Sequence, residues 1–280
     1  MSILSIQSSV VYGYVGNRAA VFLLQRLGFE TWPLDTVSLS NHAGHPTVRG
    51  RVVPAAELRS LLGGLAELGV LARCDAVLSG YLGEPDTADV VLEAVTRVKA
   101  EHAGAFSCCD PVMGDAPKGL YVAKELPARF RDRLLPAADI VTPNAVELEY
   151  LTGLRVTTEA EALDAADAAR RRGPGIVVVT GLRQAAGTVL ATLAVTDDRA
   201  WVARTARRDR PAHGAGDAFT AVFLGAYLRH REVPRALASA VGALEAIFAT
   251  SGAPGSAELP IVAAADRIPA AAEVPVERLR

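Results

Sequence analysis

Cysteine, long apolar runs and blocks of like charge are all scarce in this chain of 280 residues. Its three cysteines, Cys74, Cys108 and Cys109, have no metal-ligand spacing, so we expect reduced, buried thiols in a cytoplasmic protein. The longest uncharged stretch, residues 1–17, is broken by polar residues and lacks a basic start. That pattern argues against a membrane span and against a secretory signal.

The charges nearly balance, because 29 Lys and Arg face 31 Asp and Glu for a formal net charge of −2. No broad basic surface of the kind that binds nucleic acid is therefore expected, and we predict neither a nucleic-acid partner nor membrane association. Glycine and proline together are close to the globular average, which excludes collagen and disordered classes.

Short apolar runs alternate with longer amphipathic segments, which is typical of an α/β fold with a mostly parallel central sheet flanked by helices. The pattern predicts strands at 3–5, 76–79, 105–109, 139–141 and 176–180. It predicts helices at 18–27, 55–68, 87–101, 159–172, 215–230 and 234–250. The functional site is expected at the carboxyl ends of the strands.

Residues 31–53 depart from this alternation. Two extended segments flank the polar stretch 40–46, so we predict a small β excursion that could serve as a lid. No repeat or Gly/Ser linker divides the chain, and we interpret residues 1–280 as one domain.

The most informative motif is residues 213–219, where Gly214, Ala215 and Gly216 precede Asp217 at the start of an apolar helix. Glycine lets the backbone approach an anion, and the free amides and positive helix end favour phosphate. Asp217 beside this cradle could take the proton of a substrate hydroxyl during phosphoryl transfer. The alternative is an ordinary helix start, where the carboxylate only complements the helix dipole.

Two further strand-end loops carry oxygen ligands. Asp110 and Asp115 follow the strand predicted at 105–109 and could face cations, since Mg²⁺ prefers such ligands; the alternative is a simple turn. Asn144 and Glu147 follow the strand at 139–141. They could hold Mg²⁺ through water or form a reciprocal helix cap, and both roles can coexist.

Thr180 and Gly181 follow the last predicted strand and could offer a hydroxyl and a close backbone approach to a nucleotide phosphate. A plain strand exit is the alternative. The chain has no P-loop, complete dinucleotide fingerprint, hydrolase elbow or zincin motif. A nucleotide site therefore needs a different scaffold.

Taken in order, these three acidic motifs resemble those of the ribokinase-like superfamily of ATP-dependent small-molecule kinases. Within it, the segments 3–8, 13–20, 40–42, 78–81 and 109–114 resemble the pyridoxal kinase family over nearly the whole chain. The resemblance implies a ribokinase-like fold and phosphorylation of the 5′-hydroxyl of pyridoxal, with pyridoxine and pyridoxamine as further acceptors. Asp217 would be the catalytic base, assisted by Gly214, Ala215 and Gly216.

The resemblance also implies binding roles. It places substrate against Ser8, Ala43, Gly44, Tyr81 and Asp217, and Mg²⁺ at Asp110, Asp115 and Glu147, and it allows K⁺ as a second cation. It implies a homodimer. It places ATP against Asp110, Thr142, Asn144, Glu147, Thr180, Gly214 and Gly216, with Thr205, Ala206, Arg207 and Arg208 as a flap over the nucleotide.

Several positions depart from the family pattern and leave other functions open. Ser9 stands where the family usually has histidine, and Ala43 stands where threonine is usual. One alternative is therefore a kinase of another hydroxymethyl heterocycle, such as hydroxymethylpyrimidine. A second is a vitamer- or nucleotide-binding protein without catalysis. The lid histidines His42 and His45 could touch substrate or phosphate, or could have no ligand.

Overall fold

A ten-stranded sheet runs through the computed structural model, which describes residues 1–183, 187–208, 213–252 and 255–280. The strands lie in the order β12-β11-β10-β9-β8-β5-β4-β1-β2-β3, parallel from β9 to β2 and antiparallel at both ends. Their bounds are β1 Ser2–Tyr12, β2 Glu30–Asn41, β3 Gly50–Val52, β4 Cys74–Ser79, β5 Phe106–Cys109, β8 Ile140–Val141, β9 Ile176–Arg183, β10 Val189–Val195, β11 Ala200–Ala206 and β12 Val276–Arg278. A small separate sheet pairs β6 (Gly114–Asp115) with β7 (Gly119–Leu120).

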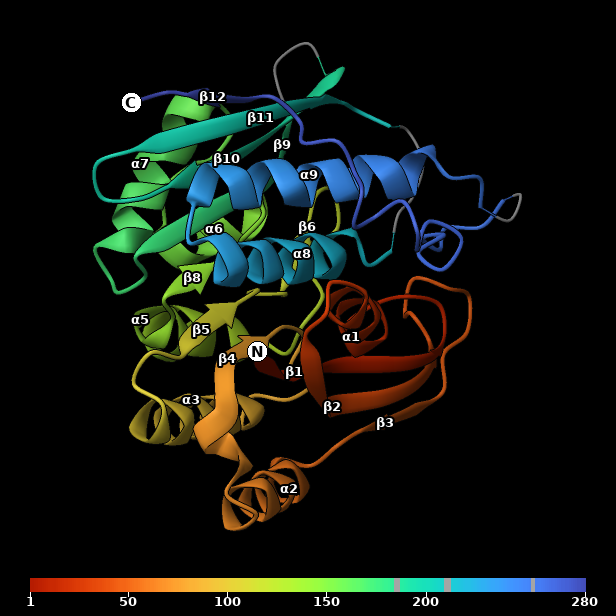
Figure 1. The fold of residues 1–280 in the computed structure, drawn as a ribbon, viewed down its shortest axis with the longest axis vertical. Helices are drawn as coiled ribbons and strands as arrows, with labels where there is room; N and C mark the ends of the chain where they lie inside the picture. The colour runs from red at the N-terminus through yellow and green to blue at the C-terminus, as the bar shows by residue number, and fades with distance from the viewer. Residues whose placement is uncertain (184–186, 209–212, 253–254) are drawn as a thin grey trace.

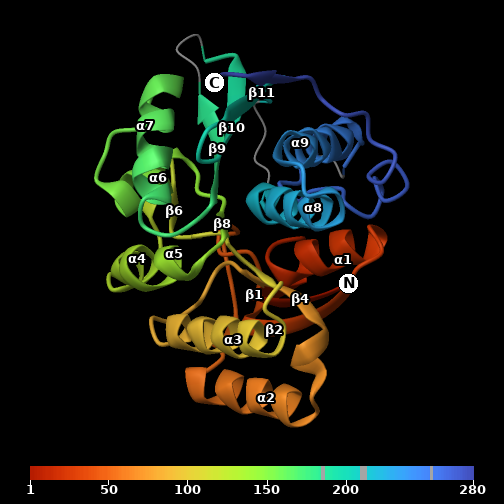
Figure 2. The same cartoon turned by 60° about the vertical axis from the view of Figure 1, so that its left-hand side comes forward.

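Helices cover both faces of the large sheet (Figures 1 and 2). One face carries α1 (Asn17–Arg26), α8 (Ala215–His230) and α9 (Val233–Ala249). The opposite face carries α2 (Ala55–Glu67), α3 (Thr87–Glu101), α4 (Leu126–Arg129), α5 (Leu135–Ala137), α6 (Ala145–Thr152) and α7 (Glu159–Arg170). A 3₁₀ turn at Val70–Arg73 and a π-helical turn at Phe130–Leu134 complete the described helical segments.

The two cores follow from alternation along strands that are buried on both faces. Neighbouring residues of a strand point to opposite faces, and Cys108 packs with the α1–α8–α9 core whereas Cys109 packs in the other. The prediction of buried, unpaired thiols is confirmed for all three cysteines. In β9, Ile176 to Val179 are all buried, as a covered parallel strand requires.

The predicted helices and four of the five predicted strands agree with the structure to within three residues. The exception is β1, predicted at 3–5 but extending to Tyr12. Gln7 and Ser8 interrupt the apolar pattern, yet both are buried and the strand continues past them, and only Val11 and Tyr12 at its end are exposed.

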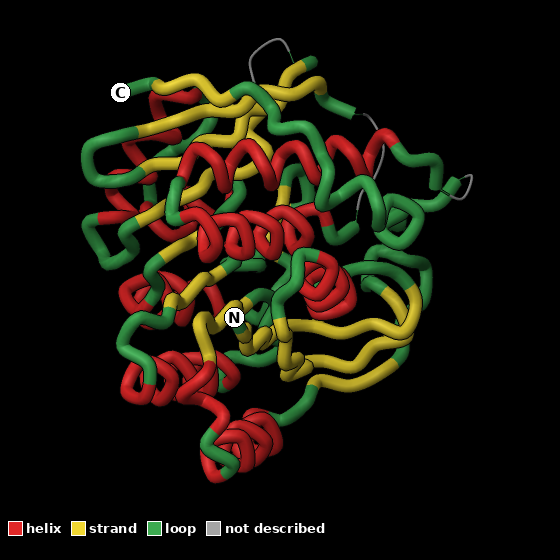
Figure 3. The backbone as a smooth tube through the Cα atoms, viewed as in Figure 1, coloured by secondary structure: helices red, strands yellow, loops and turns green. Residues whose placement is uncertain are grey.

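The excursion predicted at 31–53 is built into the main sheet. The helix α1 returns the chain so that β2 pairs in parallel with β1, and β3 then pairs antiparallel with β2. The long strands β1 and β2 run side by side below α1 in Figure 3. The sequence analysis did not predict the antiparallel strands β10, β11 and β12.

Within the described ranges, no helix combines the length and apolar character needed to cross a membrane.

Phe223 provides a test of the core beneath α8. Its side chain is fully buried (0% exposed) and lies between Phe219 and Tyr227, whose ring centroids are 6.0 and 6.4 Å away. Because a cavity would remain, Phe223→Ala should lower the free energy of unfolding by about 3–5 kcal/mol. Urea unfolding measures this change.

The control for this substitution is Leu68→Ala. Leu68 is 73% exposed, and its truncation should change stability by less than about 0.5 kcal/mol. Equal effects of the two substitutions would contradict the packing described for α8.

Candidate active site

A pocket of about 660 Å³ lies where the carboxyl ends of β1, β4, β5, β8 and β9 meet the start of α8. This is the sheet edge at which parallel α/β proteins bind ligands. The pocket brings together most of the residues selected from the sequence: Ser8, Ala43, Gly44, Tyr81, Asp110, Asp115, Thr142, Asn144, Glu147, Thr180, Gly214, Ala215, Gly216 and Asp217.

The helix α8 begins at this pocket. Gly214 is its N-cap with φ of 86°, and a Cβ there would lie 1.8 Å from the carbonyl oxygen of Tyr14. Only glycine therefore allows the chain to approach the 13–16 loop so closely. The amides of the first helical turn have no intrahelical acceptor, so this end of α8 can bind an anion.

Asp217 lies in that first turn and is half-buried. Burial raises the pKa of its carboxyl, while backbone N–H groups of Gly16 and of Asp217 itself act in the opposite direction. A raised pKa brings a carboxylate closer to the range in which a general base works well.

Asp110 is the second acid of the pocket and is 5% exposed. Burial raises the pKa of Asp110 well above its ordinary value, and the neighbouring carboxylates of Glu147 and Asp217 add to the shift. Its Oδ2 accepts a hydrogen bond of 3.3 Å from the hydroxyl of Thr220, on α8. The Thr220 hydroxyl in turn lies 2.9 Å from that of Thr142.

Glu147 is the third acid and is 3% exposed. Its Oε1 accepts from the Met113 N–H at 3.1 Å and its Oε2 from the Asn144 N–H at 2.9 Å, while Asn144 Oδ1 accepts from the Glu147 N–H at 3.0 Å. The helix cap considered in the sequence analysis is thus present. Burial nevertheless raises the pKa of Glu147 to about 8.

Asp115 is the fourth acid of the pocket and, with Asp110, Glu147 and Asp217, forms what we call the acidic group. Its Oδ1 is buried and has no hydrogen-bond partner among the described residues. An orphaned carboxylate oxygen beside two further acids fits a hard cation, because Mg²⁺ takes oxygen ligands. The residues present therefore suit a divalent ion.

The lining also includes Ser8, Tyr81 and residues 42–44 of the loop between β2 and β3, the lid loop predicted from the sequence. Burial raises the pKa of the Tyr81 hydroxyl, so its ring and neutral O–H are available for packing and hydrogen bonding. His42 also lines the pocket, and burial together with His213 lowers its pKa to about 4. His42 is therefore neutral at physiological pH.

Four of the residues assigned to nucleotide binding lie elsewhere. Thr205 and Ala206 end β11, Arg207 donates to the Thr188 and Gly187 carbonyl oxygens, and Arg208 pairs with Glu245 at 2.7 Å. None of the four is among the lining residues of the pocket in the described ranges. The structure does not bring this flap to the site.

Besides aliphatic residues, three polar or aromatic residues that line the pocket had no role predicted from the sequence: Lys118, Tyr121 and His213. Lys118 follows Asp115 by three residues, and a cation next to an acidic strand-end loop was a usable signal. His213 directly precedes the glycine motif. Tyr121 carried no signal, because it comes to the site only through the β6–β7 turn.

Known proteins resemble this chain over most of its length. Residues 69–262 match the protein-family model described as phosphomethylpyrimidine kinase. A pyridoxal kinase PdxY of Deinococcus radiodurans is 47% identical over 271 residues, covering 94% of this chain and 91% of its own, and one of Rubrobacter xylanophilus is 45% identical, covering 96% and 93%. A pyridoxal kinase of Leishmania donovani, solved with ADP and pyridoxamine, superposes with a TM-score of 0.92 at 30% identity, covering 100% of this chain and 99% of its own.

The buried acids predict how stability depends on pH. Folded Glu147 keeps its proton up to about pH 8, whereas the unfolded chain loses it near the ordinary pKa of 4.5. Unfolding between these values releases a proton, so the free energy of unfolding should fall as pH rises, by up to about 1.4 kcal/mol per pH unit. Asp110 and Asp217, whose pKa values are also raised, act in the same direction.

Urea unfolding of ligand-free protein at several pH values from 5 to 8 measures this slope. Glu147→Gln should make the dependence of the unfolding free energy on pH shallower. The substitution also costs stability at every pH, because glutamine cannot accept both backbone hydrogen bonds of the cap. The slopes of the two proteins, and not their absolute stabilities, are therefore compared. Stability that rises between pH 6 and 8 would show that the pocket holds its acids ionised.

Proposed function

Because this chain belongs to the pyridoxal kinase family, we propose that it transfers the γ-phosphate of ATP to the 5′-hydroxyl of pyridoxal, and also accepts pyridoxine and pyridoxamine. The observation that carries this proposal is the position of Asp217 within the first turn of α8. A proton acceptor and a set of free backbone amides thereby face one pocket.

The proposed reaction begins with the acceptor hydroxyl beside Asp217. Asp217 takes the proton of this hydroxyl while the hydroxyl oxygen of the acceptor forms a bond to the γ-phosphorus. The bond from that phosphorus to the β–γ bridging oxygen breaks, and ADP leaves with the electron pair. The amides at the start of α8 stabilise the charge on the migrating phosphoryl group, which is the main task of a protein in this chemistry.

The two substrates would occupy opposite parts of the pocket. Ser8, Ala43, Gly44 and Tyr81 would bind the vitamer, with the Tyr81 ring as an aromatic wall. Residues at the ends of β8 and β9 would bind ATP. The backbone N–H of Thr180 donates to the Pro143 carbonyl oxygen at 2.9 Å, which holds the ends of β8 and β9 together. Thr180 is thereby fixed beside the other residues proposed to bind ATP. The full nucleotide set is Asp110, Thr142, Asn144, Glu147, Thr180, Gly214 and Gly216, to which Lys118 adds a positive charge.

Asp110, Asp115 and Glu147 would hold Mg²⁺, with Glu147 acting through water because backbone N–H groups occupy its two oxygens. The ion would neutralise phosphate charge. We retain K⁺ as a second cation and Thr205, Ala206, Arg207 and Arg208 as a flap that closes on bound nucleotide. We also propose a homodimer, since β3 is an open sheet edge beside the exposed Val48 and Val52.

Two alternatives differ in acceptor or in activity. A hydroxymethylpyrimidine kinase is supported by Ala43, which offers no hydroxyl to a pyridine substituent, and by the matching phosphomethylpyrimidine kinase model. A binding protein without catalysis would not need an acid beside the free amides at the start of α8. The first alternative is therefore the stronger one.

Asp217→Asn tests the base. Asparagine keeps the size of the side chain but cannot accept the proton, so kcat should fall by about 100- to 10,000-fold. Formation of pyridoxal phosphate from pyridoxal and Mg²⁺-ATP gives the rate, and the dissociation constant for ATP should change little. Asp164→Asn, an exposed change on α7, is the matched control and should leave kcat unaltered. Full turnover by Asp217→Asn would remove Asp217 from its role.

A panel of acceptors tests the substrate. Pyridoxal should give a higher kcat/KM than hydroxymethylpyrimidine, and Ala43→Thr should raise the value for pyridoxal roughly two- to tenfold, the gain of one added hydrogen bond. Preference for the pyrimidine in the parent protein would favour the alternative kinase. Saturable binding of vitamer and ATP with no phosphorylated product from any acceptor would favour the binding protein.

A further inference from the structure

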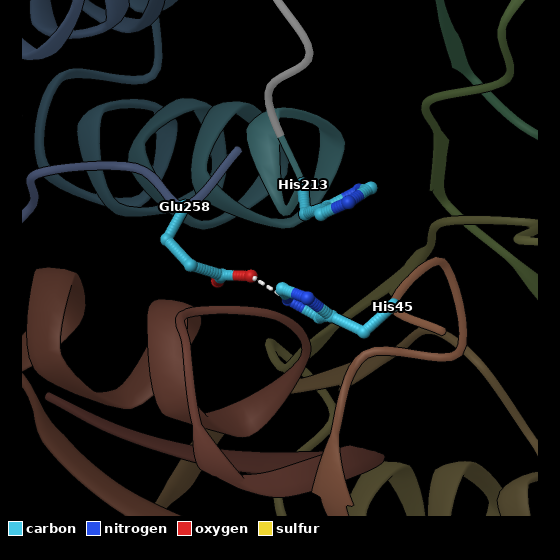
Figure 4. Close-up of side chains that lie close together, drawn as sticks. All are labelled: His45, His213 and Glu258. Carbon is cyan, nitrogen blue, oxygen red and sulfur yellow. Dashed lines mark hydrogen bonds and ion pairs between the residues drawn. The ribbon is translucent and has the colours of Figure 1, made fainter. Parts of the chain in front are cut away.

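Three side chains outside the acidic group lie close together near the start of α8 (Figure 4). His45 comes from the loop between β2 and β3, His213 directly precedes α8, and Glu258 lies in the segment after α9. One ligand atom from each lies within 4.8 Å of the other two. The His45 Nε2 and the Glu258 Oε1 are already 2.8 Å apart. Segments separated by up to 213 residues thus converge on one point.

The carboxylate of Glu258 is held in place from behind. Its side chain is only 8% exposed, and its Oε2 accepts from the Tyr14 N–H at 3.1 Å. Gly13 makes room for it, because a Cβ at Gly13 would lie 2.1 Å from this same oxygen. Such backbone support orients a carboxylate so that its other oxygen faces the two histidines.

The imidazole rings are also oriented by their neighbours. The backbone N–H of His213 donates to the Ala257 carbonyl oxygen at 3.1 Å, which anchors His213 beside Glu258. The His213 ring stacks on His42 with centroids 4.0 Å apart and meets the His45 ring edge-on at 5.8 Å. The His45 ring in turn packs against Tyr12 at 5.9 Å. The donors are therefore brought together by contacts that do not depend on an ion.

Two imidazoles and one carboxylate form the donor set of three-ligand zinc sites, which leave a fourth position open. We propose that His45, His213 and Glu258 bind one divalent transition-metal ion, with Zn²⁺ as the fitting case. In a tetrahedral site with Zn–N and Zn–O bonds of about 2.0–2.2 Å the donors lie roughly 3.4 Å apart. Binding would therefore draw the most distant donors together and open the His45–Glu258 pair, now at 2.8 Å, slightly. His45 lies on the loop between β2 and β3, which would adjust with it. Mg²⁺ does not compete well here, because it prefers oxygen ligands.

Occupancy of this site would join three parts of the chain that otherwise meet through hydrogen bonds and ring contacts. His45 belongs to the lid loop, and His213 adjoins Gly214 at the start of α8. A bound ion would therefore hold the lid against the first turn of α8. The proposal concerns binding and stands independently of the kinase reaction.

The experiment titrates chelator-treated protein with Co²⁺ as a visible probe, in excess Mg²⁺ and without ATP or vitamer. We expect one Co²⁺ per chain, with the absorption of nitrogen-ligated cobalt, and displacement by Zn²⁺. His45→Gln and Glu258→Gln should each weaken binding by more than about tenfold, the lower bound for loss of even a supporting residue. The melting temperature of the parent should rise with Zn²⁺, and that of His45→Gln should not.

His230→Gln is the matched control, because His230 ends α8 away from the cluster and its loss should leave Co²⁺ binding unchanged. Circular dichroism in chelator establishes that each variant is folded. No uptake of Co²⁺ by the parent would overturn the proposal. So would uptake that both variants retain, or uptake that disappears in Glu147→Gln instead, since that would place the ion in the acidic group.

Discussion

Mutual repulsion among carboxylates is the constraint on which the site depends. Asp110, Asp115, Glu147 and Asp217 line one pocket, and burial together with neighbouring charge raises the pKa values of Asp110 and Glu147. Such a group is stable only beside positive charge or with protons retained. The start of α8 and Lys118 supply part of the positive charge, and a divalent ion would supply the rest. The unpartnered Asp115 oxygen is the local sign of this deficit.

The fold positions these acids by rigid means. Each lies at a strand end or in the first turn of a helix. Asn144, which caps α6 together with Glu147, also ties this helix to β6, because its side-chain Nδ2 donates to the Gly114 carbonyl oxygen at 2.8 Å. The helix α8 is buried along most of its length, so its first turn cannot move without disturbing the core. The loop between β2 and β3 is held differently, because His45 pairs with Glu258 and His42 packs against His213.

The sequence predicted the parallel core and most of the acidic site because both follow local rules. Buried strands such as 176–180 appear as short apolar runs, and Asp110 of the acidic site directly follows one of them. The prediction of β1 was too short because the polar residues Gln7 and Ser8 break the apolar pattern; Ser8 lines the pocket, and the buried Gln7 amide donates to the Ser5 hydroxyl at 2.8 Å. Tyr121 and Glu258 could not be placed, since their neighbours are set by tertiary contacts that no local pattern encodes. Residues 205–208 were predicted as a nucleotide flap by resemblance alone. In this structure Arg207 donates to the Gly187 carbonyl oxygen and Arg208 pairs with Glu245.

The hydrogen bond from Tyr14 to Glu258 spans 244 residues of chain. During synthesis from the N-terminus, β1 and the 13–16 loop emerge first, whereas the carboxylate that fixes this loop emerges near the end. Helix α8, which Tyr14 also contacts through Gly214, appears only slightly earlier. The N-terminal half of the sheet can therefore form as a growing unit, but the loop at 13–16 is fixed only after Glu258 has left the ribosome, 244 residues later than Tyr14.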